Sequence, residues 1–320
     1  MLQYIIILLD DNSTSFCHYD IPQNRKNNLI DIDVLKKGIR FAMKNNLRIQ
    51  FVYPEEDIPK SYVDIINSTN HIKIKPYIST QKDDTDVLVV NEPPFDFIKG
   101  KHNIATFRLT LQEFLNLQDS LISLVCKTVK RINVVIRGKD FSRNFDFVKY
   151  QTKLEHLSEL IEKEYLAGNF TQWNILTDKM MLSEMNNCGA GDTSITLAPN
   201  GKFYICPAFY YDDIEDTVGD IQNGLNIPNQ QLYKLKYSPI CLHCDAYQCK
   251  RCVWLNRRMT LEVNTPSHEQ CVSSHIERNT SRKLLNNIRR YGDFLKDTII
   301  NEIDYLDPFE KVDQWKQENL

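Results

Sequence analysis

Nine cysteines occur among the 320 residues, and seven of them are concentrated between residues 188 and 271. Four fall within the segment CLHCDAYQCKRC at 241–252, as two CxxC pairs separated by four residues. A CxxC turn lets two sulfurs face one ion or cluster, and thiolates bind soft or borderline metal centres. The spacing therefore indicates metal binding by this segment.

The seven late cysteines form an ordered string. Twelve residues separate Cys188 from Gly201, and four separate Gly201 from Cys206. The four-cysteine block comes next, and eighteen residues separate its last cysteine, Cys252, from Cys271. Four thiolates hold one zinc ion or one cubane iron–sulfur cluster, so seven thiolates exceed one site and nearly fill two. The alternatives are one structural zinc site, whose two pairs usually stand further apart, and a chance cluster of unliganded thiols.

Composition and charge indicate which binding partners and which cellular compartment to expect for this protein. The formal net charge of −3 gives no basic footprint for a nucleic acid. No apolar run approaches the ~20 residues of a membrane helix, and YIIILL at 4–9 is too short for a signal peptide. We therefore expect a cytoplasmic protein with no membrane partner, in which cysteines serve metal or thiol chemistry rather than disulfides.

Residues 1–180 alternate short apolar runs with amphipathic helix patterns, which predicts βαβ units and a mostly parallel sheet. Several runs are continuously apolar, as in strands that are covered on both faces. We expect an α/β partial barrel of about six strands, with an open doubly wound sheet as the alternative. The strand candidates are residues 4–9, 48–53, 71–77, 86–90, 103–108, 132–136 and 172–177.

Helices are predicted over residues 31–46, 110–129 and 145–167. The second opens on Thr110 and Glu113, the spacing of a capping box. Its predicted apolar stripe comprises Phe114, Leu117, Leu121 and Leu124.

The regular alternation of strand and helix patterns ends after residue 180. Two strand-like runs surround Pro199-Asn200-Gly201, which signals a hairpin, and a final helix is predicted over about 280–303. We expect three parts: a partial barrel at 1–180, a small cysteine-rich domain at 181–280, and a C-terminal helix and tail at 281–320.

The cysteine string resembles the SPASM domain, the C-terminal auxiliary-cluster module of many peptide-modifying radical S-adenosylmethionine enzymes. That pattern has a cysteine, a Gly-x4-Cys about a dozen residues later, a four-cysteine block and a last cysteine downstream. Cys188, Gly201 to Cys206, the block at 241–252 and Cys271 fill these places in order, and VGDI at 218–221 resembles a further short segment of the family. The block departs from the family by being one residue tighter in each of its last two gaps.

The resemblance implies two 4Fe-4S clusters. The outer cluster would be held by Cys241, Cys244, Cys249 and Cys271. The inner one would be held by Cys188, Cys206 and Cys252, which leaves one iron open for a substrate thiolate or another ligand. His243 and His268 are candidates for an extra ligand or for a hydrogen bond to cluster sulfur.

Such domains normally follow a partial (βα)6 barrel that carries a CxxxCxxC loop after its first strand. Here the loop at 10–20 contains Cys17 as its only cysteine, and the GGE-like segment expected after the second strand reads VYPEED. The resemblance thus implies a degenerate radical-SAM-like barrel that does not bind and cleave S-adenosylmethionine. Cys17 is interpreted as a vestigial or reactive thiol, or as an ordinary buried one.

A barrel-like N-terminus without the radical loop, joined to a SPASM-like tail, resembles the CXXX repeat peptide maturases of bacterial peptide-modification systems. Residues 244–271 look like the most recognisable stretch of that family. The resemblance implies work on a ribosomally synthesised, cysteine-rich precursor peptide, by binding it or transferring electrons, with a partner modification enzyme or an electron donor. The alternatives are a peptide-binding scaffold with structural zinc and an enzyme whose barrel-loop chemistry is unrelated to the tail.

Overall fold

The computed structural model forms two compact units, each built from two separate stretches of sequence. It describes residues 2–23, 27–78, 85–91, 102–185, 187–247, 249, 251–303 and 305–310, apart from the side chain of His102. Unit 1 comprises Met1–Glu92 and Cys188–Tyr237, and unit 2 comprises Pro93–Asn187 and Ser238–Leu320. The domains 1–180, 181–280 and 281–320 stay predictions from the sequence.

The sheet of unit 1 is parallel except at the strand on one edge. Its strands are β1 (Tyr4–Leu8), β2 (Arg48–Val52), β3 (His71–Pro76), β4 (Val87–Val90), β8 (Ser194–Leu197) and β9 (Phe203–Tyr204). They lie in the order β4-β3-β2-β1-β8-β9, and β9 runs antiparallel to β8. The run YIIIL of β1 is apolar because the strand is central, and Ile5, Ile7 and Leu8 are completely buried. The predicted hairpin is confirmed as the β8–β9 connection.

Helix α1 (Ile32–Lys44) packs tightly on this sheet, and α2 (Lys60–Ile66) follows β2. The carboxylate of Asp31 caps α1 by accepting hydrogen bonds from the N–H groups of Asp33 and Val34. A Cβ on Gly38 would lie 2.4 Å from Cδ2 of Leu197, so glycine lets the helix approach β8.

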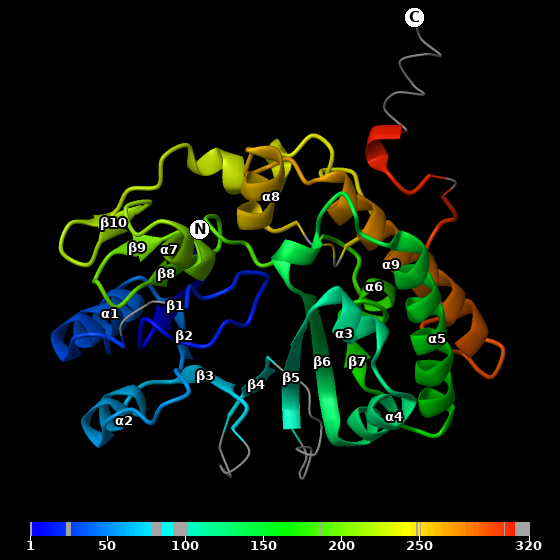
Figure 1. The fold of residues 1–320 in the computed structure, drawn as a ribbon, viewed down its shortest axis with the longest axis horizontal. Coiled ribbons are helices and arrows are strands. Elements are labelled where there is room, and N and C mark those ends of the chain that lie inside the picture. The colour runs from blue at the N-terminus through cyan, green and yellow to red at the C-terminus, as the bar shows by residue number, and fades with distance from the viewer. Residues whose placement is uncertain are drawn as a thin grey trace, which may run out of the picture. The chain divides into compact units, whose positions relative to one another are not determined.

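Unit 2 combines three parallel strands with the longest helices. The strands pair in the order β5 (His102–Leu109), β6 (Val129–Ile136) and β7 (Gln172–Trp173). The helices are α3 (Leu111–Leu115), α4 (Asp119–Thr128), α5 (Phe147–Leu166), α6 (Thr177–Met181), α8 (Val253–Thr260) and α9 (His268–Ile288), with a 3-10 turn η1 (Gly138–Asp140). Helices α5 and α9 lie side by side, and α6 also contacts α9 (Figure 1).

A buried ion pair joins α6 to α9 in unit 2. Nζ of Lys179 lies 3.2 Å from Oε2 of Glu277, and each side chain is 1% exposed. Tyr150 of α5 donates its hydroxyl to Oε1 of Glu277 at 2.5 Å. Burial, together with the negative charge of Glu277, raises the pKa of Tyr150 well above its usual value. Three helices are thus fixed at one point in the middle of α9.

The predicted helix at 110–129 is wrong in one respect, because the chain forms two helices, α3 and α4. The capping box is confirmed: Glu113 N–H donates to Thr110 Oγ1 at 3.2 Å, and Thr110 N–H donates to Glu113 Oε2 at 2.6 Å. The chain is not helical between α3 and α4, at residues 116–118. In α4, Val125 is buried, whereas Leu124, predicted to lie on the apolar stripe, is 41% exposed.

The predicted final helix at 280–303 is also corrected, since α9 spans His268–Ile288. A capping box of Ser267 and Gln270 fixes the start of the helix. This box precedes residue 280, where the regular spacing of apolar residues begins. The helix stops at its C-cap, Arg289, and Leu295 adopts a left-handed φ of 43° that interrupts any continuation.

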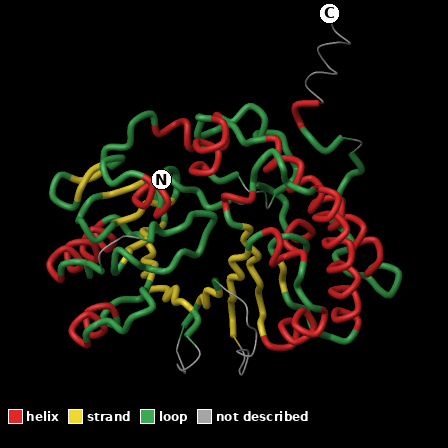
Figure 2. The backbone as a smooth tube through the Cα atoms, viewed as in Figure 1, coloured by secondary structure: helices red, strands yellow, loops and turns green. Residues whose placement is uncertain are grey.

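The remaining connections are short or irregular. Strand β7 ends at Trp173 rather than continuing to residue 177, because Thr177 Oγ1 accepts the Trp173 N–H at 2.6 Å as α6 begins. Figure 2 shows that the part of unit 1 after α7 (Pro207–Asp212) is mostly loop. It contains β10 (Gly219–Asp220), β11 (Gly224–Leu225) and two 3-10 turns, η2 (Gln230–Tyr233) and η3 (Leu235–Tyr237). Over the residues that the structure describes, no helix combines the length and apolar character needed to span a membrane.

Candidate metal centre

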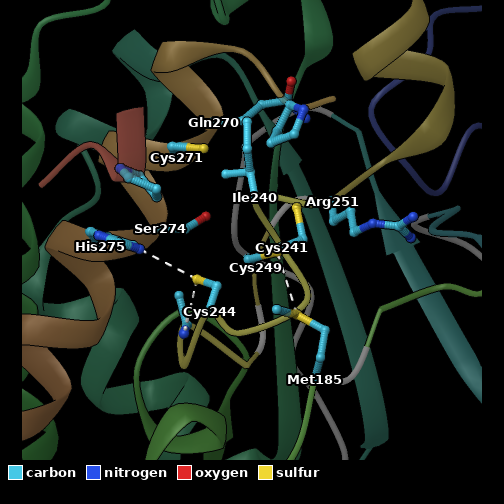
Figure 3. A pocket seen from close by; sticks show the side chains of 13 residues that line it. Met185, Ile240, Cys241, Cys244, Cys249, Arg251, Gln270, Cys271, Ser274 and His275 are labelled. Atoms are coloured by element: carbon cyan, nitrogen blue, oxygen red, sulfur yellow. Dashed lines mark hydrogen bonds between the residues drawn. The ribbon is translucent and has the colours of Figure 1, made fainter. Parts of the chain in front are cut away.

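Four of the predicted ligands surround one cavity of unit 2. Three of them reach it from the loop before α8, and the fourth comes from the start of α9 (Figure 3). They are Cys241, Cys244, Cys249 and Cys271, the set that the resemblance assigns to the outer cluster. None of the four forms a disulfide in the part of the chain that the structure describes. The fold therefore gathers this set, and its metal ligation stays a prediction.

Backbone hydrogen bonds shape the first CxxC pair. The N–H of Cys241 donates to the carbonyl of Ser238 at 3.1 Å, and the N–H of Cys244 donates to the carbonyl of Cys241 at 3.2 Å. The N–H of Ala246 then donates to the sulfur of Cys244 at 3.5 Å. A donor aimed at sulfur favours the thiolate over the thiol, so Cys244 is prepared to act as a ligand.

Cys271 is positioned by the start of α9. Gln270 N–H donates to Ser267 Oγ at 3.3 Å, and Ser267 N–H donates to Gln270 Oε1 at 2.9 Å. The side-chain amide of Gln270 also donates to Oδ1 of Asn256 at 2.8 Å, which ties α9 to α8. The positive end of the helix dipole lies close to Cys271 and favours a thiolate there.

His275 is a site residue that the sequence analysis missed. It lines the same cavity, and its Nε2 lies 3.4 Å from the sulfur of Cys244. Burial lowers the pKa of His275 to about 4, so the ring is neutral at physiological pH. Cys271 and His275 are four residues apart on α9 and share a face, but the predicted helix began at about residue 280, so this spacing gave no signal in the sequence.

Three of these thiols lie in surroundings that disfavour the thiolate form. Burial, followed by the negative charge of Cys249, raises the pKa of Cys241 to about 12. Burial is also the main cause that raises the pKa of Cys244 to about 11, and it raises the pKa of Cys271 as well. A bound cation would favour the deprotonated form of these three groups.

Arg251 supplies a buried positive charge beside the cavity. Its side chain donates from Nη2 to Oγ of Ser238 at 2.6 Å, and its charge lowers the pKa of Cys241 against the effect of burial. Its Nε is buried and has no hydrogen-bond partner among the described residues. An unused donor beside four thiols fits a site for an anionic, thiolate-ligated cluster.

The donor set suits an iron–sulfur cluster in its chemistry. Within the described ranges, no three His, Cys, Asp or Glu side chains converge closely enough to bind one metal ion as they stand. A cubane cluster places its four thiolates on four separate irons, so the thiols need only surround it. Met185 adds a soft thioether to the lining, 3.6 Å from the sulfur of Cys249.

The cysteines assigned to the inner cluster lie in different units. Cys188 and Cys206 belong to unit 1, where Cys206 immediately precedes α7. Cys252 belongs to unit 2, where it is the N-cap of α8. The inner set of three therefore stays a prediction. Cys17, in the loop after β1, is half-buried and also belongs to unit 1.

The two histidines proposed as extra ligands do not line the cavity of unit 2. His243 is exposed. His268 pairs through Nδ1 with Oδ2 of Asp307 at 2.6 Å and meets the ring of Phe147 edge-on. Their role as ligands stays a prediction, whereas His275 is the histidine that contacts a cysteine sulfur.

The fold is similar to that of several solved proteins at low sequence identity. Native anSMEcpe with bound AdoMet has a TM-score of 0.59 and 12% identity, covering 90% of this chain and 100% of that one. Streptococcus suis SuiB bound to S-adenosylmethionine has a TM-score of 0.54 and 12% identity, covering 84% of this chain and 77% of that one. SuiB bound to the precursor peptide SuiA has a TM-score of 0.50 and 12% identity, covering 84% and 76%.

No model of a protein family matches the sequence, and no curated protein matches it either. The similar structures therefore establish the fold alone. The predicted fold class, an α/β partial barrel, is confirmed by the parallel strand order and by these matches.

Proposed function

We propose that this chain is an iron–sulfur protein of the SPASM type that acts in the maturation of a ribosomally synthesised, cysteine-rich peptide. The observation that carries the proposal is the set of four thiols around one cavity of unit 2. These thiols would hold one 4Fe-4S cluster, and Cys188, Cys206 and Cys252 would hold a second. Such clusters supply iron that can bind a thiolate, or a centre that transfers an electron.

Residues of unit 2 would adapt the cavity to such a cluster. Arg251 would offset the negative charge of the thiolate-ligated centre, and its Nε would find the acceptor that it lacks. The N–H of Ala246 and the Nε2 of His275 would both donate to the sulfur of Cys244. These donors would stabilise Cys244 as a thiolate ligand against the opposing effect of burial.

The peptide part of the proposal is supported by the similar structures. Native anSMEcpe was also solved with AdoMet and the Cp18Cys peptide, at a TM-score of 0.59 and 12% identity. SuiB was solved with its precursor peptide SuiA. For this chain, the resemblance of the cysteine string favours a peptide with repeated CXXX units, handled with a partner modification enzyme or an electron donor.

Cleavage of S-adenosylmethionine is not part of the proposed function, although AdoMet is bound in anSMEcpe and SuiB. The loop after β1 offers Cys17 alone where the resemblance requires three cysteines. Reduced, cluster-loaded protein should release no deoxyadenosine from S-adenosylmethionine. Stoichiometric release would contradict this part of the proposal.

Binding of a CXXX peptide tests the peptide role directly. A synthetic peptide with cysteine at every fourth position should bind the cluster-loaded full chain and change its visible absorption spectrum. The same peptide with serine at each cysteine position is the matched control and should bind more weakly, without the spectral change, because a hydroxyl is a poor ligand for iron. Equal binding of both peptides, or of neither, would count against the proposal.

A scaffold with structural zinc is the second candidate function. It is favoured by the two CxxC turns, because four thiolates from such turns also form closed zinc sites. In that case the chain would bind the peptide without redox chemistry, and its purified form would be colourless.

A further inference from the structure

Unit 1 holds a group of three cysteines that the sequence analysis did not connect. The resemblance assigns Cys188 and Cys206 to the inner cluster, but it leaves Cys17 as a vestige or an isolated thiol. The three positions come from separate stretches of chain. The β8–β9 hairpin and helix α7 bring these stretches together.

Cys188 and Cys206 lie at the same end of the β8–β9 hairpin. The antiparallel register pairs Thr196 with Tyr204, so Cys206, two residues after Tyr204, lies at the end of the hairpin where β8 begins. Ser194 begins β8, and its Oγ donates to the carbonyl of Cys188 at 3.3 Å. Both cysteines therefore belong to the same end of the hairpin.

The loop that carries Cys17 packs against α7, the helix that Cys206 precedes. Tyr211 of α7 donates its hydroxyl to the carbonyl of Ser13 at 3.2 Å. Tyr19 stacks on the Tyr211 ring, with ring centres 5.3 Å apart and 17° between the planes. Both flanks of Cys17 are thus fixed on Tyr211 of α7, the short helix that begins directly after Cys206.

We propose that Cys17, Cys188 and Cys206 together hold one iron–sulfur cluster in unit 1. Cys17 is then a ligand of the second cluster and not a remnant of a lost S-adenosylmethionine loop. This inference rests on the proposed function, because it takes the metal centre to be iron–sulfur. Three thiolates leave one iron of a four-iron cluster without a cysteine ligand. Cys252 of unit 2 stays the residue predicted for that iron.

Differential alkylation of the wild-type, full-length chain tests this ligand set without any substitution. Cys17 is half-buried and Cys188 is exposed, so both should react with iodoacetamide in the metal-free protein. In the cluster-loaded protein, the reaction of Cys17 should slow by about tenfold or more, together with that of Cys188 and Cys206. Buried Cys126, with its pKa raised to about 11, is the internal reference and should stay unreactive in both forms. An unchanged rate at Cys17 overturns the inference.

Iron counting in variants gives the second readout. Cys17→Ala should lower the iron content from about eight to about four per chain, whereas Cys126→Ala should keep about eight. The double variant C17A/C206A should lose no more iron than C206A alone, because both ligands belong to one cluster. Wild-type iron content and an unchanged electron paramagnetic resonance spectrum in C17A would overturn this inference alone. Wild-type protein that carries no iron would overturn the proposed function itself.

Discussion

The sulfur of Cys244 has two polar contacts in the candidate metal centre. The N–H of Ala246 and the ring of His275 both reach it, at 3.5 Å and 3.4 Å. Because the His275 ring is buried and neutral, its Nε2 would carry the proton once Cys244 binds a metal as a thiolate. Hydrogen bonds to ligand sulfur raise the reduction potential of a cluster.

Substitution of His275 should therefore change the potential of a bound cluster more than its assembly. We expect His275→Leu to retain the iron of the wild type and to lower the midpoint potential by on the order of tens of millivolts. His275→Gln keeps a side-chain N–H and should restore most of the shift. Potentiometric titration followed by electron paramagnetic resonance measures both values.

His243 is the matched control for this prediction. It belongs to the same cysteine block, but its side chain is exposed and does not line the cavity. The variant H243L should therefore keep the wild-type potential. Equal shifts in the two leucine variants would show that the contact with Cys244 is not what sets the potential.

The histidine contact also shows what spacing alone could predict. The ligand candidates Cys241, Cys244, Cys249 and Cys271 came from the cysteine string, and the fold places all four around one cavity. His275 was missed because attention to residues within and beside the CxxC pairs favoured His243. Its helical spacing from Cys271 becomes informative only when the helix is known to start at residue 268.

At the scale of elements, the start of α9 links helix capping to the metal centre. The Ser267–Gln270 box fixes the turn that carries Cys271. The Thr110–Glu113 box caps the start of α3 in the same way, but its residues do not line the cavity of the four cysteines. The two boxes therefore form a natural pair for comparison.

Removal of the Ser267 hydroxyl should destabilise unit 2 and loosen its cluster. We expect Ser267→Ala to lower the free energy of unfolding by about 1 kcal/mol and to speed the loss of iron to a chelator. Thr110→Ala should cost about the same stability through the loss of its cap, but it should release iron at the wild-type rate. Urea unfolding and chelator kinetics separate the two effects, and equal iron loss from both variants would contradict the link.

The elements differ in how well the sequence predicted them. The central strands were predicted within a residue or two, because strands buried on both faces need continuous apolar runs. The break at residues 116–118 was missed because the residues on either side keep the same apolar spacing across it. A residue such as Leu124 was then placed on the wrong face.

At the scale of the whole molecule, the chain leaves one compact unit and later returns to it. Strand β8 pairs with β1 across more than half of the sequence, with Ile195 beside Ile5. Local patterns specify that both segments are strands, but they do not specify that two such distant runs are neighbours. The sequence therefore predicted the α/β class but not the interleaved composition of the two units.

Because each unit is built from two separate stretches of sequence, the cysteines are divided between the two units. Unit 2 holds Cys241, Cys244, Cys249 and Cys271 around one cavity, and unit 1 holds Cys17, Cys188 and Cys206. One string in the sequence thus contributes thiols to both units. On the proposed ligand assignment, loss of Cys244 should empty a different cluster from loss of Cys206.

The central claim is that these thiols bind iron–sulfur clusters, and the metal and sulfide content of the anaerobically purified wild-type chain tests it most directly. We predict a brown protein with broad absorbance near ~400 nm and about eight irons and eight sulfides per chain. Colourless protein that carries stoichiometric zinc and no sulfide after the same handling would contradict the account.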